Sequence, residues 1–275
     1  MVTDSTADLD PSVAAAAGLS VLPLHIVYRE GSYRDGVDIT AEQVYSRLDQ
    51  EVPGTSTPSP QEAADLLTGL RDRGFTHVLA IHISAALSRT LETVRLAARD
   101  VAGLTTAVID SRVISMGIGF IALEAARLAA EGKTSFAELV EKVKAMVPYS
   151  NIICALKTLE YFRRGGRIGA VAAAAAGLLD LKPIISMKDG VFYSPGRVRG
   201  WKHALDAIYD LARQAVEAGA NRIAVMHGDA LAEAQALLER VKNLPGVAAP
   251  VLGRIGTTIG VHGGPGTVGV CLARV

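Results

Sequence analysis

Several kinds of residue are scarce in this chain of 275 residues. Neither charge is in excess, because 28 Lys and Arg face 28 Asp and Glu and the formal net charge is +0. Such a chain has no general attraction to nucleic acid or to an anionic membrane surface. Aromatic residues make up only 5% although hydrophobic residues make up 49%, so small and aliphatic side chains dominate the apolar fraction. This composition is typical of closely packed, layered α/β proteins.

Cysteine and long apolar runs are scarce as well. Cys154 and Cys271 lie far apart in the sequence among apolar residues, and we expect buried free thiols rather than a disulfide. Charged residues interrupt the two most apolar stretches, 113–130 and 168–185, so neither resembles a membrane span of about 20 apolar residues. No basic segment followed by an apolar run opens the sequence. We therefore expect a cytoplasmic protein without membrane insertion.

Motifs that mark several common kinds of site are missing from the sequence. It has no P-loop and no complete dinucleotide-binding fingerprint. No group of His, Cys, Asp and Glu has the spacing of metal ligands, so we expect no metal site. A Gly-x-Ser-x-Gly nucleophile turn is also missing. A serine hydrolase of an acyl substrate, using Ser84 or Ser88 with His262, stays an alternative because such groups assemble in space rather than in sequence.

Apolar runs and helical periodicity alternate along the first half of the chain, which predicts a parallel sheet covered by helices. The predicted strands are 19–27, 78–83, 106–109, 152–155, 223–226 and 268–271. Thr40, Ser59 and Ser135 each begin a capping box and therefore predict helix starts. Asp189-Gly190 lies between two apolar runs and predicts an antiparallel hairpin. We expect an α/β fold with a doubly wound parallel domain at 1–155 and a mixed-sheet α/β domain at 156–275.

Two hydroxyl-rich loops, 55–59 and 84–88, directly precede predicted helices. Free N–H groups and the helix dipole at such positions favour a carboxylate or phosphate, although the hydroxyls can also act only as helix caps. The glycine-rich segment 255–266 surrounds His262 and predicts a turn from which the imidazole nitrogens reach a ligand. A basic cluster at 197–203 precedes a further predicted helix. It is either a solvated helix start or a contact for an acidic partner or head group.

Several segments together resemble the DegV family of bacterial fatty-acid-binding proteins. They occur in the family's order from the first residues to the last. The segments are TDSTADL (3–9), DGVDI (35–39), TSTPS (55–59), ISAALS (83–88), VIDS (108–111), RGGRI (164–168), LKPI (181–184), KHA (202–204) and HGGPG (262–266). The chain departs from the family pattern at Thr57, Ala85 and Arg89, where the family usually has Gln, Ser and Gly.

The resemblance implies a long-chain fatty acid held in a tunnel between the two domains. It places the carboxylate near Thr55 and Ser84, with His262 close to the head group. It also implies that the protein itself is not an enzyme and has no cofactor other than its bound lipid. A separate fatty acid kinase would phosphorylate the carboxylate for phospholipid synthesis. Arg199 resembles an arginine that the family presents near the kinase-facing surface, and we expect it to be a ligand-binding residue together with Thr55, Ser84 and His262.

Overall fold

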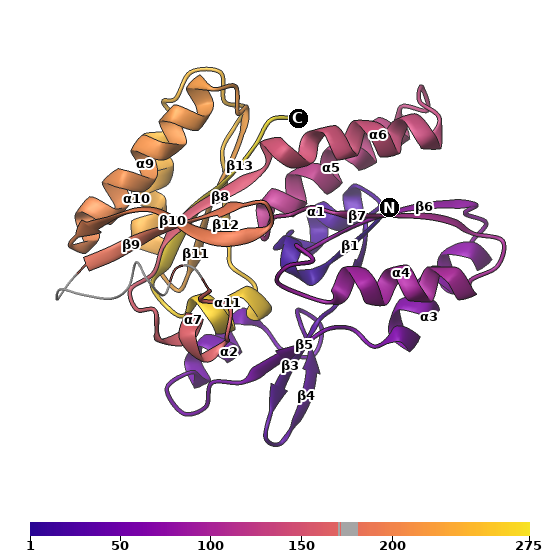
Figure 1. Ribbon diagram of the computed structural model, residues 1–275, viewed down its shortest axis with the longest axis horizontal. Coiled ribbons are helices and arrows are strands. Elements are labelled where there is room, and N and C mark those ends of the chain that lie inside the picture. Colours follow the sequence, from indigo (N-terminus) through magenta and orange to yellow (C-terminus); the bar gives the residue numbers. More distant parts are fainter. Residues whose placement is uncertain (170, 172–180) are drawn as a thin grey trace.

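The computed structural model describes residues 1–169, 171 and 181–275, and these residues form three sheets (Figure 1). One sheet is parallel and consists of β2 (Ser20–Leu22), β1 (Val2–Asp4), β6 (His77–His82) and β7 (Thr105–Asp110), in that order. In β6, Val78 and Ala80 pack on one face, whereas Leu79 and Ile81 pack on the other. A parallel strand covered on both faces requires such a continuous apolar run.

Helices cover both faces of the parallel sheet. The helices are α3 (Pro60–Asp72) and α4 (Thr90–Asp100) on one side and α1 (Pro11–Ala16), α5 (Met116–Ala130) and α6 (Phe136–Met146) on the other. The predicted capping boxes are confirmed: Ser59 begins α3, Ser135 begins α6 and Thr40 begins α2 (Ala41–Arg47). Each box satisfies two backbone N–H groups that the helix itself leaves unpaired.

The second sheet has six strands and is mixed. Its order is β10 (Val191–Arg199), β9 (Leu181–Lys188), β8 (Asn151–Ala155), β13 (Thr267–Ala273), β11 (Arg222–Gly228) and β12 (Val251–Arg254). The predicted hairpin is confirmed, because β9 and β10 are antiparallel and both Asp189 and Gly190 have positive φ, at 51° and 81°. Helices α9 (Trp201–Glu217) and α10 (Leu231–Val241) cover one face of this sheet. The predicted fold class is therefore confirmed.

Strand β8 connects the two halves of the chain. It pairs with β13 and β9, so residues 151–155 belong to the mixed sheet rather than to the parallel one. Helix α5, which precedes it, packs against strands of both sheets. The sheets thus divide the chain before Asn151, whereas a domain division at residue 155 stays a prediction.

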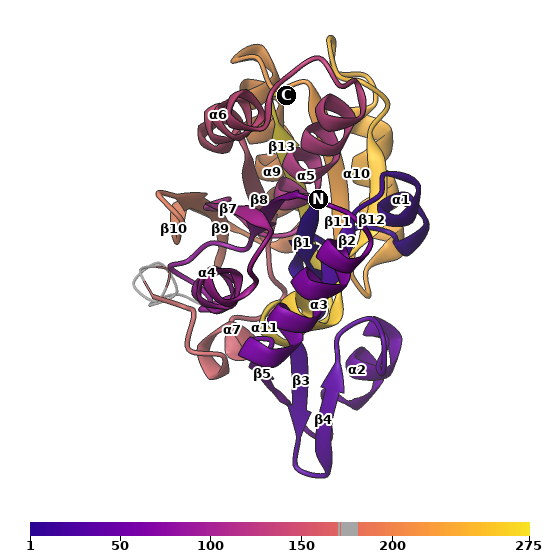
Figure 2. The same ribbon diagram turned by 90° about the vertical axis from the view of Figure 1, so that its right-hand side faces the viewer.

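The prediction of one strand over 19–27 is wrong. Strand β2 ends at Leu22 and β3 (His25–Tyr28) begins in a different, antiparallel sheet, with β4 (Gly31–Arg34) and β5 (Gly54–Ser56) on either side of it. Pro23 lies at the break, and proline has a fixed φ and no N–H for a sheet ladder. The hairpin of β3 and β4 projects away from the rest of the molecule (Figure 2).

The remaining elements of the described residues are short. They are η1 (Ser5–Ala7), η2 (Val147–Tyr149), α7 (Glu160–Arg164) and α11 (Thr257–Gly263). The predicted turn around His262 is wrong, because His262 lies in the last turn of α11, which packs on α2 and α7. Among the described helices, none is long and apolar enough to cross a membrane, and most of the apolar stretch 168–185 lies outside the described residues.

Candidate functional site

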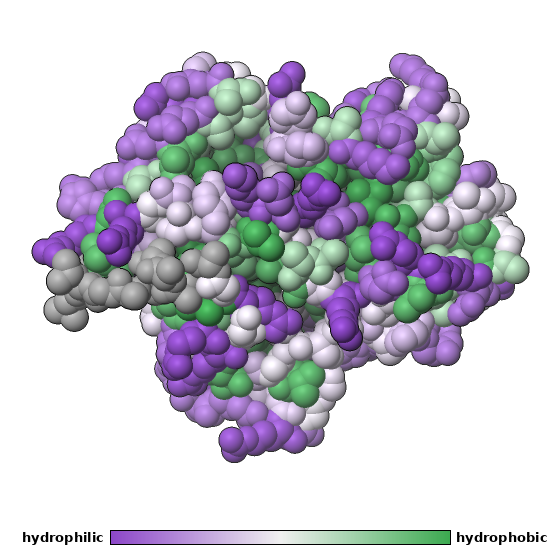
Figure 3. Space-filling view, in the orientation of Figure 1, coloured by the Kyte–Doolittle hydropathy of each residue, from purple (hydrophilic) through white to green (hydrophobic). Residues whose placement is uncertain are grey.

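A cavity of about 510 Å³ lies between the parallel sheet and the six-stranded sheet. Its volume is in the range of about 300–1,000 Å³ that is typical of small-molecule sites. The lining comes from β5, from the loops after β5, β6 and β7, from β8, β9, β10 and β13, and from α7 and α11. On the face in Figure 3, hydrophobic side chains lie among hydrophilic ones in the middle of the molecule. The loops after β6 and β7 come from the carboxyl edge of the parallel sheet, where α/β proteins commonly bind ligands.

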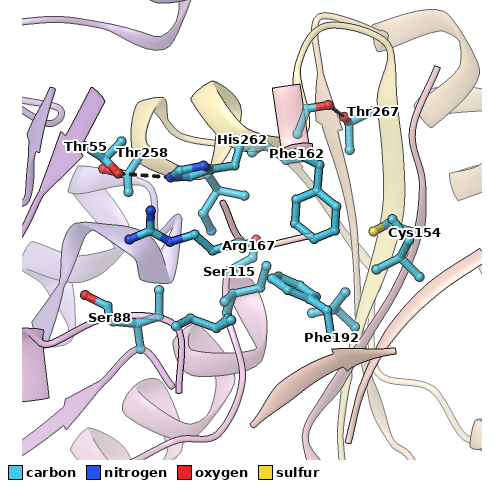
Figure 4. Close-up of a pocket in the computed structure, with 18 of the residues that line it drawn as sticks. Thr55, Ser88, Ser115, Cys154, Phe162, Arg167, Phe192, Thr258, His262 and Thr267 are labelled. Atoms are coloured by element: carbon cyan, nitrogen blue, oxygen red, sulfur yellow. Dashed lines mark hydrogen bonds between the residues drawn. The ribbon is translucent and has the colours of Figure 1, made fainter. Parts of the chain in front are cut away.

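Polar side chains line one end of this cavity. Thr55 Oγ1, from β5, lies 3.0 Å from His262 Nε2, from α11 (Figure 4). Ser88 and Thr258 also belong to the lining. The Arg167 guanidinium extends into the space between the Thr55–His262 pair and Ser88 (Figure 4). Several hydroxyls and one guanidinium around a single volume can hold an anion.

His262 is held as a neutral imidazole. Burial, together with the nearby Arg167 charge, lowers the pKa of His262 to about 4. Its Nδ1 is buried and has no hydrogen-bond partner within the described residues. The backbone of Gly165 packs so closely against the ring that a Cβ at this position would overlap it. The ring is therefore confined from one side and makes its hydrogen bond to Thr55 from the other.

The other end of the cavity is mostly apolar, and the hydroxyl of Thr267 there is bonded to the carbonyls of Gly263 and Gly264. Cys154 of β8 and Cys271 of β13 line it, together with Ile185 of β9. Phe162 of α7 and Phe192 of β10 meet edge to face there, with ring centroids 4.9 Å apart (Figure 4). The two cysteines are free thiols, as predicted, and burial raises the pKa of each to about 12. They therefore act as small apolar groups in the wall rather than as nucleophiles.

Comparison with known proteins identifies the family of this chain. The family described as "Uncharacterised protein, DegV family" matches residues 1–275. A DegV domain-containing protein of Clostridium acetobutylicum is 36% identical over 274 residues, which are 99% of this chain and 97% of the relative. The chain belongs to the DegV family.

Solved structures of DegV proteins share the fold over the whole chain. A DegV family protein from Thermus thermophilus, described by its fatty acid binding, is 32% identical with a TM-score of 0.91, over 100% of this chain and 98% of that one. A stearic-acid-binding protein from Eubacterium ventriosum is 28% identical with a TM-score of 0.91, over 99% of this chain and 97% of that one. The resemblance inferred from the DegV motifs is thereby confirmed.

Ser84, which the DegV resemblance places near the head group, lies outside the cavity lining. Its side chain is fully buried, and its hydroxyl donates a hydrogen bond of 2.7 Å to the carbonyl of Gly190, at the tip of the β9–β10 hairpin. Ser88 of the same loop lines the cavity instead. Sequence reasoning could not separate these two serines, because the direction of each side chain depends on how the loop packs against the hairpin.

Arg199 and Arg167 show a second difference from the sequence interpretation. Arg199 is exposed at the end of β10 and is outside the cavity lining. Arg167 belongs to the lining, and its Nη1 donates to the Gly165 carbonyl at 2.7 Å. In the sequence, Arg167 stands out only as part of the RGGRI segment. The only sequence feature that marks Arg167 is its position after two glycines in a DegV motif. That its side chain points into the cavity depends on the packing of α7 on α11.

The serine and histidine side chains of the hydrolase alternative do not pair. Ser84 bonds to Gly190, the Ser88 hydroxyl lies 2.8 Å from Thr90 Oγ1, and His262 bonds to Thr55. A nucleophile needs its general base within hydrogen-bond reach. No group of three or more His, Cys, Asp or Glu that could hold a metal ion occurs in the part of the chain that the structure describes.

Proposed function

We propose that this chain binds one long-chain fatty acid in the cavity. The carboxylate lies at the Thr55–His262 end, and the acyl tail lies along Cys154 toward Phe162 and Phe192. The support is the division of one cavity into a polar and an apolar end. The DegV proteins of known structure that it resembles are described as binding fatty acids. A ligand with a charged head and a long apolar tail matches this division.

The tail supplies most of the binding free energy. Burial of an acyl chain of about 16 carbons at about 0.8 kcal/mol per CH₂ gives a gross gain near 12 kcal/mol. Loss of translational freedom and ordering of the chain offset much of this gain. The apolar wall therefore sets the strength of binding, while the polar end sets the direction in which the lipid lies.

The polar end recognises the carboxylate through the Thr55 hydroxyl. Because His262 is neutral, its Nε2–H can donate to Thr55 Oγ1, which leaves the Thr55 hydroxyl proton free for a carboxylate oxygen. Arg167 supplies the positive charge, and Ser88 supplies a further hydroxyl. A hydrogen bond to a charged group contributes about 1.5–3 kcal/mol. The observation that carries the proposal is the Thr55–His262 pair at the end of an apolar cavity.

We further propose that the protein is not itself an enzyme and presents the carboxylate to a separate fatty acid kinase in the cytoplasm. The DegV resemblance supports this step, and Arg199 has the exposure that a contact with a partner requires. Replacement of Arg199 by Glu is expected to slow phosphorylation of the bound acid by such a kinase while palmitate affinity stays the same. Equal rates of phosphorylation in wild type and Arg199→Glu would show that Arg199 does not contact the kinase.

Native mass spectrometry of the purified protein tests fatty acid binding. We expect a co-purifying C14–C18 acid, or uptake of one added palmitate per chain. Thr55→Val removes the hydroxyl and should weaken palmitate binding about 10- to 100-fold. Thr105→Val, at the exposed first residue of β7, is the matched control and should change nothing. A wild-type chain that carries no acid and takes up no palmitate contradicts the proposal.

A further inference from the structure

Asp35 is a buried acidic residue that lies outside the cavity lining. It is only 6% exposed, and its carboxylate accepts hydrogen bonds from the hydroxyls of Thr257 and Thr258, the latter at 2.6 Å. The Thr258 backbone N–H lies at 3.3 Å from the same carboxylate. These contacts join the end of β4 to the first turn of α11, across more than 220 residues of sequence.

The sequence of helix α11 supports a helix poorly by itself. It has seven residues, it contains Gly260 and Gly263, and its N-cap Gly256 makes no side-chain capping bond. Glycine inside a helix costs about 1 kcal/mol, and helices this short are unstable alone. A carboxylate at the N-terminus satisfies free N–H groups and interacts favourably with the helix dipole. Asp35 supplies that carboxylate from another part of the chain.

The small sheet of β3, β4 and β5 also contacts α11 at the polar end of the cavity. Asp35 directly follows β4, and Thr55 lies in β5, and both strands pair with β3 in one small sheet. Thr258 and His262 are four residues apart in α11 and therefore lie on the same helix face. The Asp35–Thr258 contact and the Thr55–His262 contact thus fix α11 against the small sheet at two points.

We infer that Asp35 is a positioning residue, which places α11 so that His262 Nε2 meets Thr55 Oγ1 and the pair can receive a carboxylate. His262 depends on this placement, because its Nδ1 has no hydrogen-bond partner among the described residues. Within the part of the chain that the structure describes, the close packing of the ring against Gly165 and the hydrogen bond to Thr55 orient it. A shift of the first turn of α11 therefore moves the imidazole directly.

The inference rests on the proposed fatty acid binding, and two ligands of equal tail length test it. Asp35→Asn keeps the side-chain volume but places an amide donor against the hydroxyl and N–H donors of α11. We expect palmitate affinity to fall about tenfold, while affinity for 1-hexadecanol, which lacks the carboxylate, changes by less than about twofold. Asp38→Asn is the matched control, because Asp38 is exposed and bonds to Arg34 instead; it should change neither affinity.

Thr257→Val is the second variant, in case Asp35→Asn fails to fold. Thr257 is 1% exposed and lies outside the cavity lining. Its replacement by Val removes the hydrogen bond from its hydroxyl to Asp35. It should show the same selective loss for palmitate in smaller degree. Equal loss for both ligands, or no loss for either, would overturn the inference, because a purely structural role does not distinguish the two head groups.

NMR of the imidazole nitrogens in the ligand-free protein separates this inference from the proposed function. We expect the His262 Nε2 resonance to move in Asp35→Asn and to stay in place in Asp38→Asn. An unmoved resonance in Asp35→Asn contradicts the positioning role. If the wild-type chain binds neither lipid, the proposed function fails, and the NMR comparison still decides whether Asp35 positions His262.

Discussion

The two ends of the cavity are built in different ways. The apolar end consists mostly of neighbouring strands of one sheet, where Cys154 lies opposite Ile185 on one side and Gly269 on the other. The polar end joins segments that are remote in sequence, and its central pair, Thr55 and His262, is 207 residues apart. Strand register is enough to build an apolar wall, whereas directional hydrogen bonds require several separate elements to be placed correctly.

A charge in the apolar wall should have the largest effect on binding. Cys154→Asp places a carboxyl group against the acyl tail, where no described partner compensates it, and we expect palmitate affinity to fall at least about 100-fold. Calorimetric titration measures the affinity, and thermal unfolding checks that the variant folds. Cys154→Ser is the neutral control and should lose less than about tenfold. If Cys154→Asp binds palmitate within threefold of wild type, the tail does not lie along this wall.

The stability of the protein should depend on pH through Asp8, which bonds to the start of α11 near the polar end. The Asp8 carboxyl accepts hydrogen bonds from Ser115 Oγ at 2.5 Å and from the Gly256 N–H, at the start of α11, at 3.0 Å. Burial raises the pKa of Asp8 to about 8, and the charges of Asp35 and Asp4 act in the same direction. The folded protein therefore retains a proton that the unfolded chain has already released at neutral pH.

Stability should consequently fall as pH rises from about 4 toward 8. Between pH 6 and 8 the slope is up to about 1.4 kcal/mol per pH unit for this one proton. Denaturant unfolding at several pH values measures it, and Asp8→Asn should flatten the dependence. Asp10→Asn is the control, because hydrogen bonds from Ser12 lower the pKa of that exposed carboxyl, which stays ionised throughout this range. An equal slope in wild type and Asp8→Asn would show that Asp8 does not titrate here.

Ser84→Ala should have the smallest effect on the ligand. The Gly190 carbonyl is buried and loses its hydrogen-bond donor, so we expect the free energy of unfolding to fall by about 1–3 kcal/mol. Palmitate affinity should stay within about twofold, because the Ser84 hydroxyl faces the hairpin rather than the cavity. A loss of palmitate affinity as large as that of Thr55→Val would instead show that Ser84 contacts the head group.

Local sequence patterns were sufficient for many of the elements. The capping boxes at Thr40, Ser59 and Ser135 and the Asp189-Gly190 hairpin are confirmed, because each depends on residues within a few positions of one another. The prediction of one strand over 19–27 is wrong because the apolar residues continue across Pro23, although the chain passes from one sheet to another there. Hydropathy records burial, and it does not record which sheet buries the residue.

The candidate site was less predictable than the fold. Thr55 and His262, which the DegV resemblance places near the head group, do meet at the cavity. Ser84 points elsewhere, and Arg167 was recognised only as part of a motif. The glycines around His262 predict a turn, whereas the structure has a short helix whose first turn bonds to Asp35, a residue remote in sequence.

The amino-acid sequence alone determined the α/β layering, the mixed second sheet and the membership of the DegV family, since periodicity, turn residues and ordered motifs are local properties. Only the tertiary structure decided which hydroxyls face the cavity and how α11 is held. These outcomes depend on hydrogen bonds between segments separated by up to about 250 residues, such as that from Gly256 to Asp8. The direction of a hydrogen bond cannot be read from either segment by itself.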